Sequence, residues 1–88
     1  NPFTDHTSFV IGLPEVGKAS LTVYTRVGER VCRVIKNADM PAGVHVVRWE
    51  GINDNGRSLA PGTYEYLLDY VHAGKTDRIR KRLVLTRE

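Results

Sequence analysis

The stretch TYEYLLDYV, residues 63–71, alternates large apolar side chains with mostly smaller or polar ones. One face of this stretch would carry Tyr64, Tyr66, Leu68 and Tyr70. Side chains on a β-strand point alternately to the two faces of the sheet, and aromatic and β-branched residues are enriched in strands. The preceding Pro61 and Gly62 are typical turn residues. This stretch therefore predicts a β-strand with one buried face.

Similar runs recur along the chain, each bounded by a turn that contains Gly or Pro. We expect strands at about residues 7–13, 18–24, 29–36, 44–49, 58–60, 63–71 and 78–86. No window shows the i, i+3, i+4, i+7 apolar spacing of an amphipathic helix. Short strands separated by frequent turn signals are typical of sandwiches and barrels. The pattern therefore favours an all-β fold: an immunoglobulin-like (fibronectin III-like) antiparallel β-sandwich of about seven strands.

Apolar positions that share a phase within these strands define the predicted core. Its members are Phe9, Ile11, Leu21, Val23, Val47, Trp49, Tyr64, Tyr66 and Leu68. Within residues 29–36, Val31 and Val34 break strict alternation, and a β-bulge near Arg33 would return both to the core face. Residues 37–43 and 72–77 are expected to be loops. The sandwich has no disulfide, because Cys32 is the only cysteine.

The length of 88 residues fits one domain, so we expect a single module over residues 1–88. No run of apolar residues is long enough for a transmembrane helix. The sequence opens with Asn-Pro-Phe rather than Met, which indicates a processed chain or a piece of a longer protein.

Positive charge is concentrated at the C-terminal end. Residues 74–88 hold six Lys and Arg residues against Asp77 and Glu88, a local charge of +4, whereas residues 1–73 sum to −1. Such an asymmetry can mark contact with an acidic partner. It is equally typical of a solvated strand that is kept basic to discourage edge pairing.

Catalytic constellations are weak in this sequence. Cys32 has no histidine nearby in the chain, as a nucleophile would need, and a structural cysteine is the simpler interpretation. His6, His45 and His72 fall in three separate segments without metal-ligand spacing. Residues 53–56, Asn-Asp-Asn-Gly, do not have the ligand spacing of a calcium-binding loop. They instead predict a turn held by side-chain-to-backbone hydrogen bonds. We expect no enzyme, cofactor or metal site.

Two ligand classes depend on where the aromatic residues lie. Nucleic-acid binding would need stacking aromatics beside the basic run 78–82, which has none, so we expect no nucleic-acid partner. Trp49 could stack on a carbohydrate if it were exposed. Because it alternates with Val47 and His45, a core position is the favoured interpretation.

Several motifs together resemble one known family. They are Leu-Pro-Glu-x-Gly at 13–17, Pro-Ala-Gly-x-His-x-Val-x-Trp-Glu-Gly at 41–51, Asp-Asn-Gly-Arg at 54–57, Pro-Gly-Thr-Tyr-x-Tyr-x-Leu at 61–68 and Arg-Lys-Arg-Leu-Val-Leu at 80–85. The pattern resembles the Ig-like domain shared by the flagellar hook-capping protein and many secreted bacterial proteins. In the latter, such a domain stands at the C-terminus as the type IX secretion sorting signal.

The resemblance implies a non-catalytic module that directs a secreted protein to the bacterial cell surface through a protein partner. It implies recognition through residues 61–64 and 81–85, to which we add a charge match by the basic run. The predicted partner-binding residues are Pro61, Gly62, Thr63, Tyr64, Arg78, Arg80, Lys81, Arg82, Leu83 and Leu85.

Two further functions stay open at this stage. The chain could be a structural subunit of a cell-surface filament, linked through edge strands or a swapped segment at residues 1–6. It could also be an accessory domain of a secreted hydrolase that binds sugar through Trp49 or the tyrosines.

Overall fold

The computed structural model, which describes residues 2–3 and 5–86, is built from strands alone. Its strands are β1 (Pro2–Phe3), β2 (Thr7–Leu13), β3 (Gly17–Thr25), β4 (Arg30–Met40), β5 (Gly43–Trp49), β6 (Gly62–His72) and β7 (Lys75–Leu85). Within these residues no helix is long and apolar enough to cross a membrane. The all-β prediction is confirmed. Asn1, Thr4, Arg87 and Glu88, which belong to the predicted swapped segment and to the charge count, lie outside the described residues.

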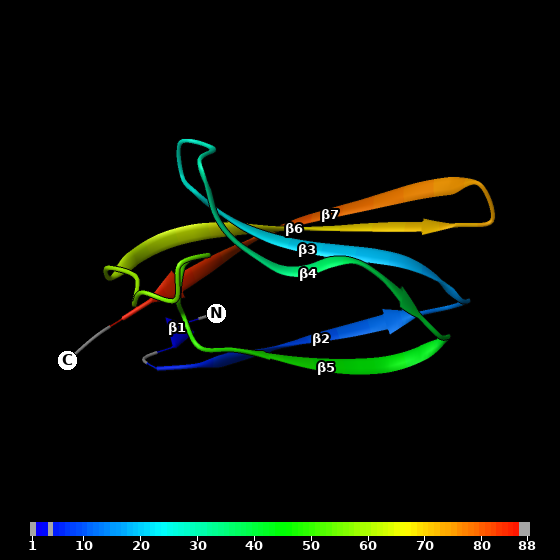
Figure 1. Cartoon of the computed structure of the whole chain (residues 1–88), viewed down its shortest axis with the longest axis horizontal. Coiled ribbons are helices and arrows are strands. Elements are labelled where there is room, and N and C mark those ends of the chain that lie inside the picture. The colour runs from blue at the N-terminus through cyan, green and yellow to red at the C-terminus, as the bar shows by residue number, and fades with distance from the viewer. Residues whose placement is uncertain (1, 4, 87–88) are drawn as a thin grey trace.

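The strands form two layers (Figure 1). The larger sheet has the order β1-β7-β6-β3-β4, and the smaller one pairs β2 with β5. All pairs are antiparallel except β1 with β7, in which Pro2 and Phe3 lie opposite Val84 and Leu85. The layers face each other across one hydrophobic core, as the sandwich prediction requires.

Alternation along the strands builds this core. In β2, Phe9, Ile11 and Leu13 are buried and the residues between them are exposed. β6 and β7 contribute buried Leu68, Tyr70, Leu83 and Leu85. In the same sheet, Ala19, Leu21 and Val23 of β3 are buried beside β6. Val47, Tyr64 and Tyr66 are partly buried against this cluster. The ring of Phe9 links the layers, because it lies 4.9 Å from that of Tyr66 in an edge-on contact.

Trp49 is a core residue. Its side chain is only 4% exposed, its ring lies 6.2 Å from that of Phe9, and its indole N–H donates to the carbonyl of Ile52 at 3.2 Å. A sugar cannot stack on a ring that is covered in this way. The proposal that Trp49 binds carbohydrate is therefore wrong.

Strand β4 carries the predicted irregularity. Its register with β3 shifts three times, and one shift lies between the pairs Leu21–Ile35 and Thr22–Arg33, at the expected place. Cys32 and Ile35 enter the core, while Val31 and Val34 are partly buried at its margin. The irregularity lies where it was predicted, but it brings Cys32 and Ile35 into the core instead of the two valines.

The predicted loops at 37–43 and 72–77 are shorter than expected. Asn37 adopts a positive φ of 45° within β4, and its N–H donates to Ser20 Oγ at 3.0 Å, so it forms a bulge instead of ending the strand. At the other site, only Ala73 and Gly74 connect β6 to β7, both with positive φ. That is the geometry of a tight two-residue hairpin turn, which Ala rarely adopts.

The structure has seven strands, but they are not the seven that the sequence predicts. Residues 58–60 do not form a strand, because only Ser58 pairs, with Ile52, in an isolated bridge. The two-residue strand β1 was not predicted. Without it, six strands carry the sandwich, one fewer than expected.

Candidate partner-binding surfaces

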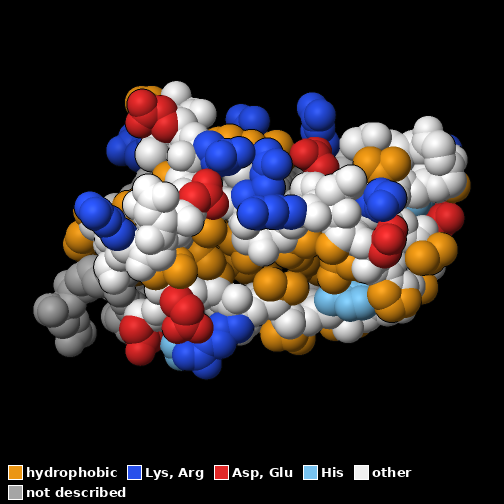
Figure 2. Space-filling view, in the orientation of Figure 1, with side chains coloured by type: hydrophobic (Ala, Val, Ile, Leu, Met, Phe, Trp, Pro, Cys, Tyr) orange, Lys and Arg blue, Asp and Glu red, His pale blue; other side chains and the backbone are white. Residues whose placement is uncertain are grey.

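Strand β7 presents the basic run on an open sheet edge. It pairs with β6 along its whole length, whereas β1 covers only Val84 and Leu85 on the other side. Residues 75–82 are all exposed. Among the described strands, the outer backbone edge of this half therefore has no partner, and Figure 2 shows most Lys and Arg side chains over the larger sheet.

Two of the four predicted cationic residues of β7 already have carboxylate partners on β6. Arg78 Nε lies 2.7 Å from Asp69 Oδ1, and Arg80 lies 3.9 Å from Glu65. Within the described part of the chain, Lys81 and Arg82 form no ion pair. Because exposed ion pairs are weak, Arg78 and Arg80 can exchange these partners for others, but Lys81 and Arg82 offer charge without such competition.

The predicted role of the Leu83 and Leu85 side chains needs a correction. Both were predicted to contact a partner, yet each side chain is 1% exposed and packs in the core. They share a strand phase with Ile79 and Lys81, which face the same side of the sheet. Leu83 and Leu85 therefore position β7, and their side chains do not form part of its accessible surface.

Residues 61–64 form a corner at one end of the sandwich. Together with Thr25, Arg26 and Val27 they line an open depression of about 570 Å³. Pro61 and Gly62 are exposed, while Thr63 and Tyr64 are partly buried. The Tyr64 hydroxyl donates to the carbonyl of Ala60 at 2.6 Å, which ties the corner to the start of β6 in the manner of a tyrosine corner. Tyr64 thus shapes this surface and has its hydroxyl committed within the chain.

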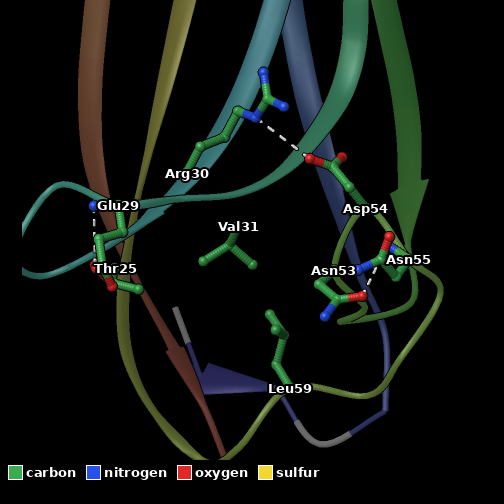
Figure 3. Close-up of a pocket in the computed structure, with 8 residues that line it drawn as sticks. All are labelled: Thr25, Glu29, Arg30, Val31, Asn53, Asp54, Asn55 and Leu59. Atoms are coloured by element: carbon green, nitrogen blue, oxygen red, sulfur yellow. Dashed lines mark hydrogen bonds and ion pairs between the residues drawn. The ribbon is translucent and has the colours of Figure 1, made fainter.

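A second depression, of about 510 Å³, lies between the loop 51–59 and the start of β4 (Figure 3). Asn53 Oδ1 accepts from the backbone N–H groups of Asn55 and Arg57 at 2.9 and 3.0 Å, which confirms the predicted turn. Asp54 accepts from the N–H of Arg33 at 2.9 Å and lies 3.3 Å from Arg30 Nε. The Arg33 N–H holds the pKa of the Asp54 carboxyl below its usual range.

The polar groups of this depression bind one another. Its polar side chains hold the loop to the bulged strand, and Asp54 N–H also donates to the carbonyl of Val31 at 3.0 Å. In residues 2–3 and 5–86, no group of three or more His, Cys, Asp or Glu side chains is arranged to hold a metal ion. Cys32 is buried, and burial raises the pKa of its thiol, which makes it a poor nucleophile.

The three histidines make separate contacts. His6 pairs with Asp5, and His45 Nε2 donates to the carbonyl of Pro41 at 2.7 Å. His72 Nε2 donates to Asp77 at 2.7 Å, while its Nδ1 lies 3.2 Å from Glu15 without hydrogen-bond geometry. The bond to Asp77 raises the pKa of His72. This cluster was not predicted from the sequence, because both His72 and Asp77 were expected to lie in a loop.

The FlgD Ig-like domain family model matches residues 3–74. The chain belongs to this family. The match covers β2 to β6 together with the turn that follows, and it ends just before β7. Of the predicted partner-binding residues, the corner 61–64 thus lies inside the matched region and the basic strand lies outside it.

Solved structures agree with the family match. FlgD from Pseudomonas aeruginosa is similar with a TM-score of 0.73 and 27% identity over 91% of this chain, and the chain spans 62% of that protein. Dimeric latent PorU from Porphyromonas gingivalis is similar with a TM-score of 0.82 over the whole chain. At 14% identity this second likeness shows the fold alone, and it involves 9% of the PorU chain. No curated protein sequence matches the chain.

Proposed function

We propose that residues 1–88 form one non-catalytic Ig-like module that acts as a C-terminal sorting and anchoring domain, for type IX-like secretion of a bacterial protein to the cell surface. The observation that carries the proposal is the exposed first half of β7, which combines an open backbone edge with a basic side-chain set. Such an edge can bind a protein by strand pairing, while its charges select an acidic partner.

The comparisons support a module of this kind. The chain belongs to the FlgD Ig-like family, and a domain of the same fold makes up a small part of the long PorU chain. Two depressions, one between residues 25–31 and 53–59 and one at the corner 61–64, are open to the surface. A role based on surfaces fits this shape better than a role based on an enclosed site.

The position of the domain in a fusion protein tests the sorting role. A fluorescent reporter with a Sec signal peptide is produced in a bacterium that has a type IX secretion system, with this domain at its C-terminus, at its N-terminus, or absent. The proposal predicts surface-exposed reporter, measured by protease shaving of whole cells, only for the C-terminal fusion. Equal retention of all three reporters in the periplasm would contradict it.

Size-exclusion chromatography and electron microscopy of the purified chain address the filament alternative. Pro2 and Phe3 pair with β7 of their own chain, so this part of the predicted swapped segment is already bound within one molecule. We expect a discrete species without fibres. Fibres that form through β-strand contacts would favour the structural subunit over the sorting domain.

A further inference from the structure

The smaller sheet leaves strand β2 open on one side. Among the described strands, β2 pairs only with β5, through seven consecutive residue pairs without a register shift. Its sequence, TSFVIGL, contains no charged residue and no Pro. Soluble proteins usually protect an exposed edge with charges, Pro or bulges. The edge of β2 has none of these and is therefore suited to accept another strand.

The two edges of the larger sheet differ from β2 in this respect. Strand β4 is interrupted by three register shifts and carries Arg30, Arg33 and Lys36. Strand β7 carries the basic run, which discourages pairing with strands other than acidic ones. Both edges thus show protective features that are absent from β2. Strand β5, the other edge of the smaller sheet, carries Arg48, so β2 is less protected than these edges.

A groove runs between this edge and the larger sheet. Residues 9–12 of β2 form one wall, and Ile79 and Lys81 of β7 line the opposite side, beside their paired residues Leu68 and Tyr66 of β6. Its volume is about 110 Å³, enough to receive an aliphatic side chain. A methyl group added to Gly12 would meet nothing within 4 Å, because this position faces the exposed outer side of β2.

The side chains of β7 that face this groove differ in character. Ile79 and Lys81 face the same side of the sheet as the buried Leu83, yet Ile79 is 46% exposed because neither β2 nor β5 covers it. Lys81 forms no ion pair among the described residues. The uncovered surface thus offers one apolar and one cationic position, two residues apart.

We propose that β2 and β7 bind an extended segment of a protein partner, added as a third strand beside β2, whose apolar side chain packs on Ile79 and whose acidic side chain pairs with Lys81. Alternate residues of a strand share a face, so the required pattern is apolar-x-acidic. Main-chain bonds to β2 supply affinity, and the two side chains select sequence and direction. This peptide site goes beyond the sorting role and does not depend on it.

Peptide titration by NMR tests the site directly. The probes are acetyl-TVTVTET-amide, its reverse sequence, and versions of both with Lys in place of Glu. We expect one Glu peptide to bind and to shift the backbone amide signals of residues 8–13 together with those of Ile79 and Lys81. If no Glu peptide shifts these amides at millimolar concentration, the proposal is overturned.

A matched pair of exposed residues provides the control. Ile79 and Val71 are 46% and 43% exposed but lie on opposite faces of the larger sheet. Loss of one apolar contact corresponds to about a ten-fold weaker Kd, so Ile79→Lys should weaken binding to that extent and Val71→Lys should not. Equal weakening by both variants would contradict a contact at Ile79.

Charge reversal tests the acidic position. The Lys81→Glu variant should bind the Glu peptide about three-fold more weakly and the Lys peptide more tightly by a similar factor. The effect is small because an exposed ion pair is worth less than about 1 kcal/mol. An unchanged preference would overturn the role of Lys81. If the amides of residues 8–13 shift with protein concentration in the absence of peptide, the edge binds a second copy of this chain and the partner proposal is wrong.

Discussion

At the scale of the residue, Gly17 shows how closely β3 approaches the end of β6. An ideal Cβ at this position would lie 2.5 Å from the carbonyl oxygen of Val71 and 2.7 Å from Cε1 of Tyr70. The nearest of these atoms belongs to the backbone and cannot move aside without disturbing the pairing of β3 with β6. Gly17 is therefore required by space and not by turn geometry.

Gly17→Ala should lower the free energy of unfolding by about 1–3 kcal/mol, because the added methyl group overpacks this contact. Gly12→Ala is the control: it lies in β2 with open space around its Cβ position, and it should change stability by less than about 0.5 kcal/mol. Urea denaturation of the two variants measures the difference. Equal stability of both would show that the ends of β3 and β6 do not approach as described.

His72 contacts residues from two separate segments of the sandwich. Its ring stacks on Tyr70 with centroids 4.1 Å apart, and the Tyr70 hydroxyl donates to the carbonyl of Glu15 at 2.6 Å. Glu15 and Asp77 both face the imidazole. The cluster therefore joins the turn between β2 and β3 to the hairpin of β6 and β7.

Because the pKa of His72 is raised in the folded protein, stability should fall as the pH rises. Its stabilising contribution is fully present below the unfolded value of about 6.5 and is lost as pH rises through the higher folded pKa. Thermal melts between pH 6 and 9 should show a falling Tm for the wild type and a flatter curve for His72→Gln. Identical slopes would contradict the link between His72, Asp77 and Glu15.

At the scale of the element, the corner before β6 depends on one hydroxyl. Tyr64→Phe removes the donor to the Ala60 carbonyl and leaves the ring in place. The free energy of unfolding should fall by about 0.5–1.5 kcal/mol, the usual contribution of such a bond. Thr63→Ala, next to it on the same strand, is a suitable comparison in thermal melts. A Tyr64→Phe variant as stable as the wild type would show that the corner holds without this bond.

Strand β7 divides into paired and unpaired cations, which predicts a graded effect on recognition. Lys81→Gln with Arg82→Gln should reduce surface export of a C-terminal fusion more than Arg78→Gln with Arg80→Gln, because the second pair already faces Asp69 and Glu65. Both double variants remove two charges, so each controls for the other. A larger loss with Arg78 and Arg80 would show that the ion pairs with β6 do not limit recognition.

The elements also show what sequence reasoning can reach. Strict alternation in residues 7–13 predicted β2 and its buried face with correct bounds, because every second side chain is apolar. Ala73 at positive φ hid the tight turn, since composition favours Gly or Asn there. The groove beside β2 could not be predicted from the sequence, because it depends on which strands share a sheet. The lack of charged residues in 7–13 could be read from the sequence.

At the scale of the whole molecule, a five-stranded sheet faces a two-stranded one. The smaller sheet covers the centre of the larger sheet and leaves part of β7 exposed on both faces. Figure 2 shows hydrophobic side chains in a band between the two layers, at the surface of the molecule. Unequal layers therefore produce both the basic edge of β7 and the groove beside β2, which are the surfaces with which this module can act.

The most direct test of the sorting role is the export of a C-terminal fusion in which Arg78, Arg80, Lys81 and Arg82 are all replaced by Gln. The control replaces four exposed cations elsewhere, Lys18, Arg33, Lys36 and Arg57, and so removes the same charge. With both variants folded by circular dichroism, we predict that the β7 variant loses surface-exposed reporter while the control retains it. Unchanged export of the β7 variant would contradict the central claim that this strand is the recognition element.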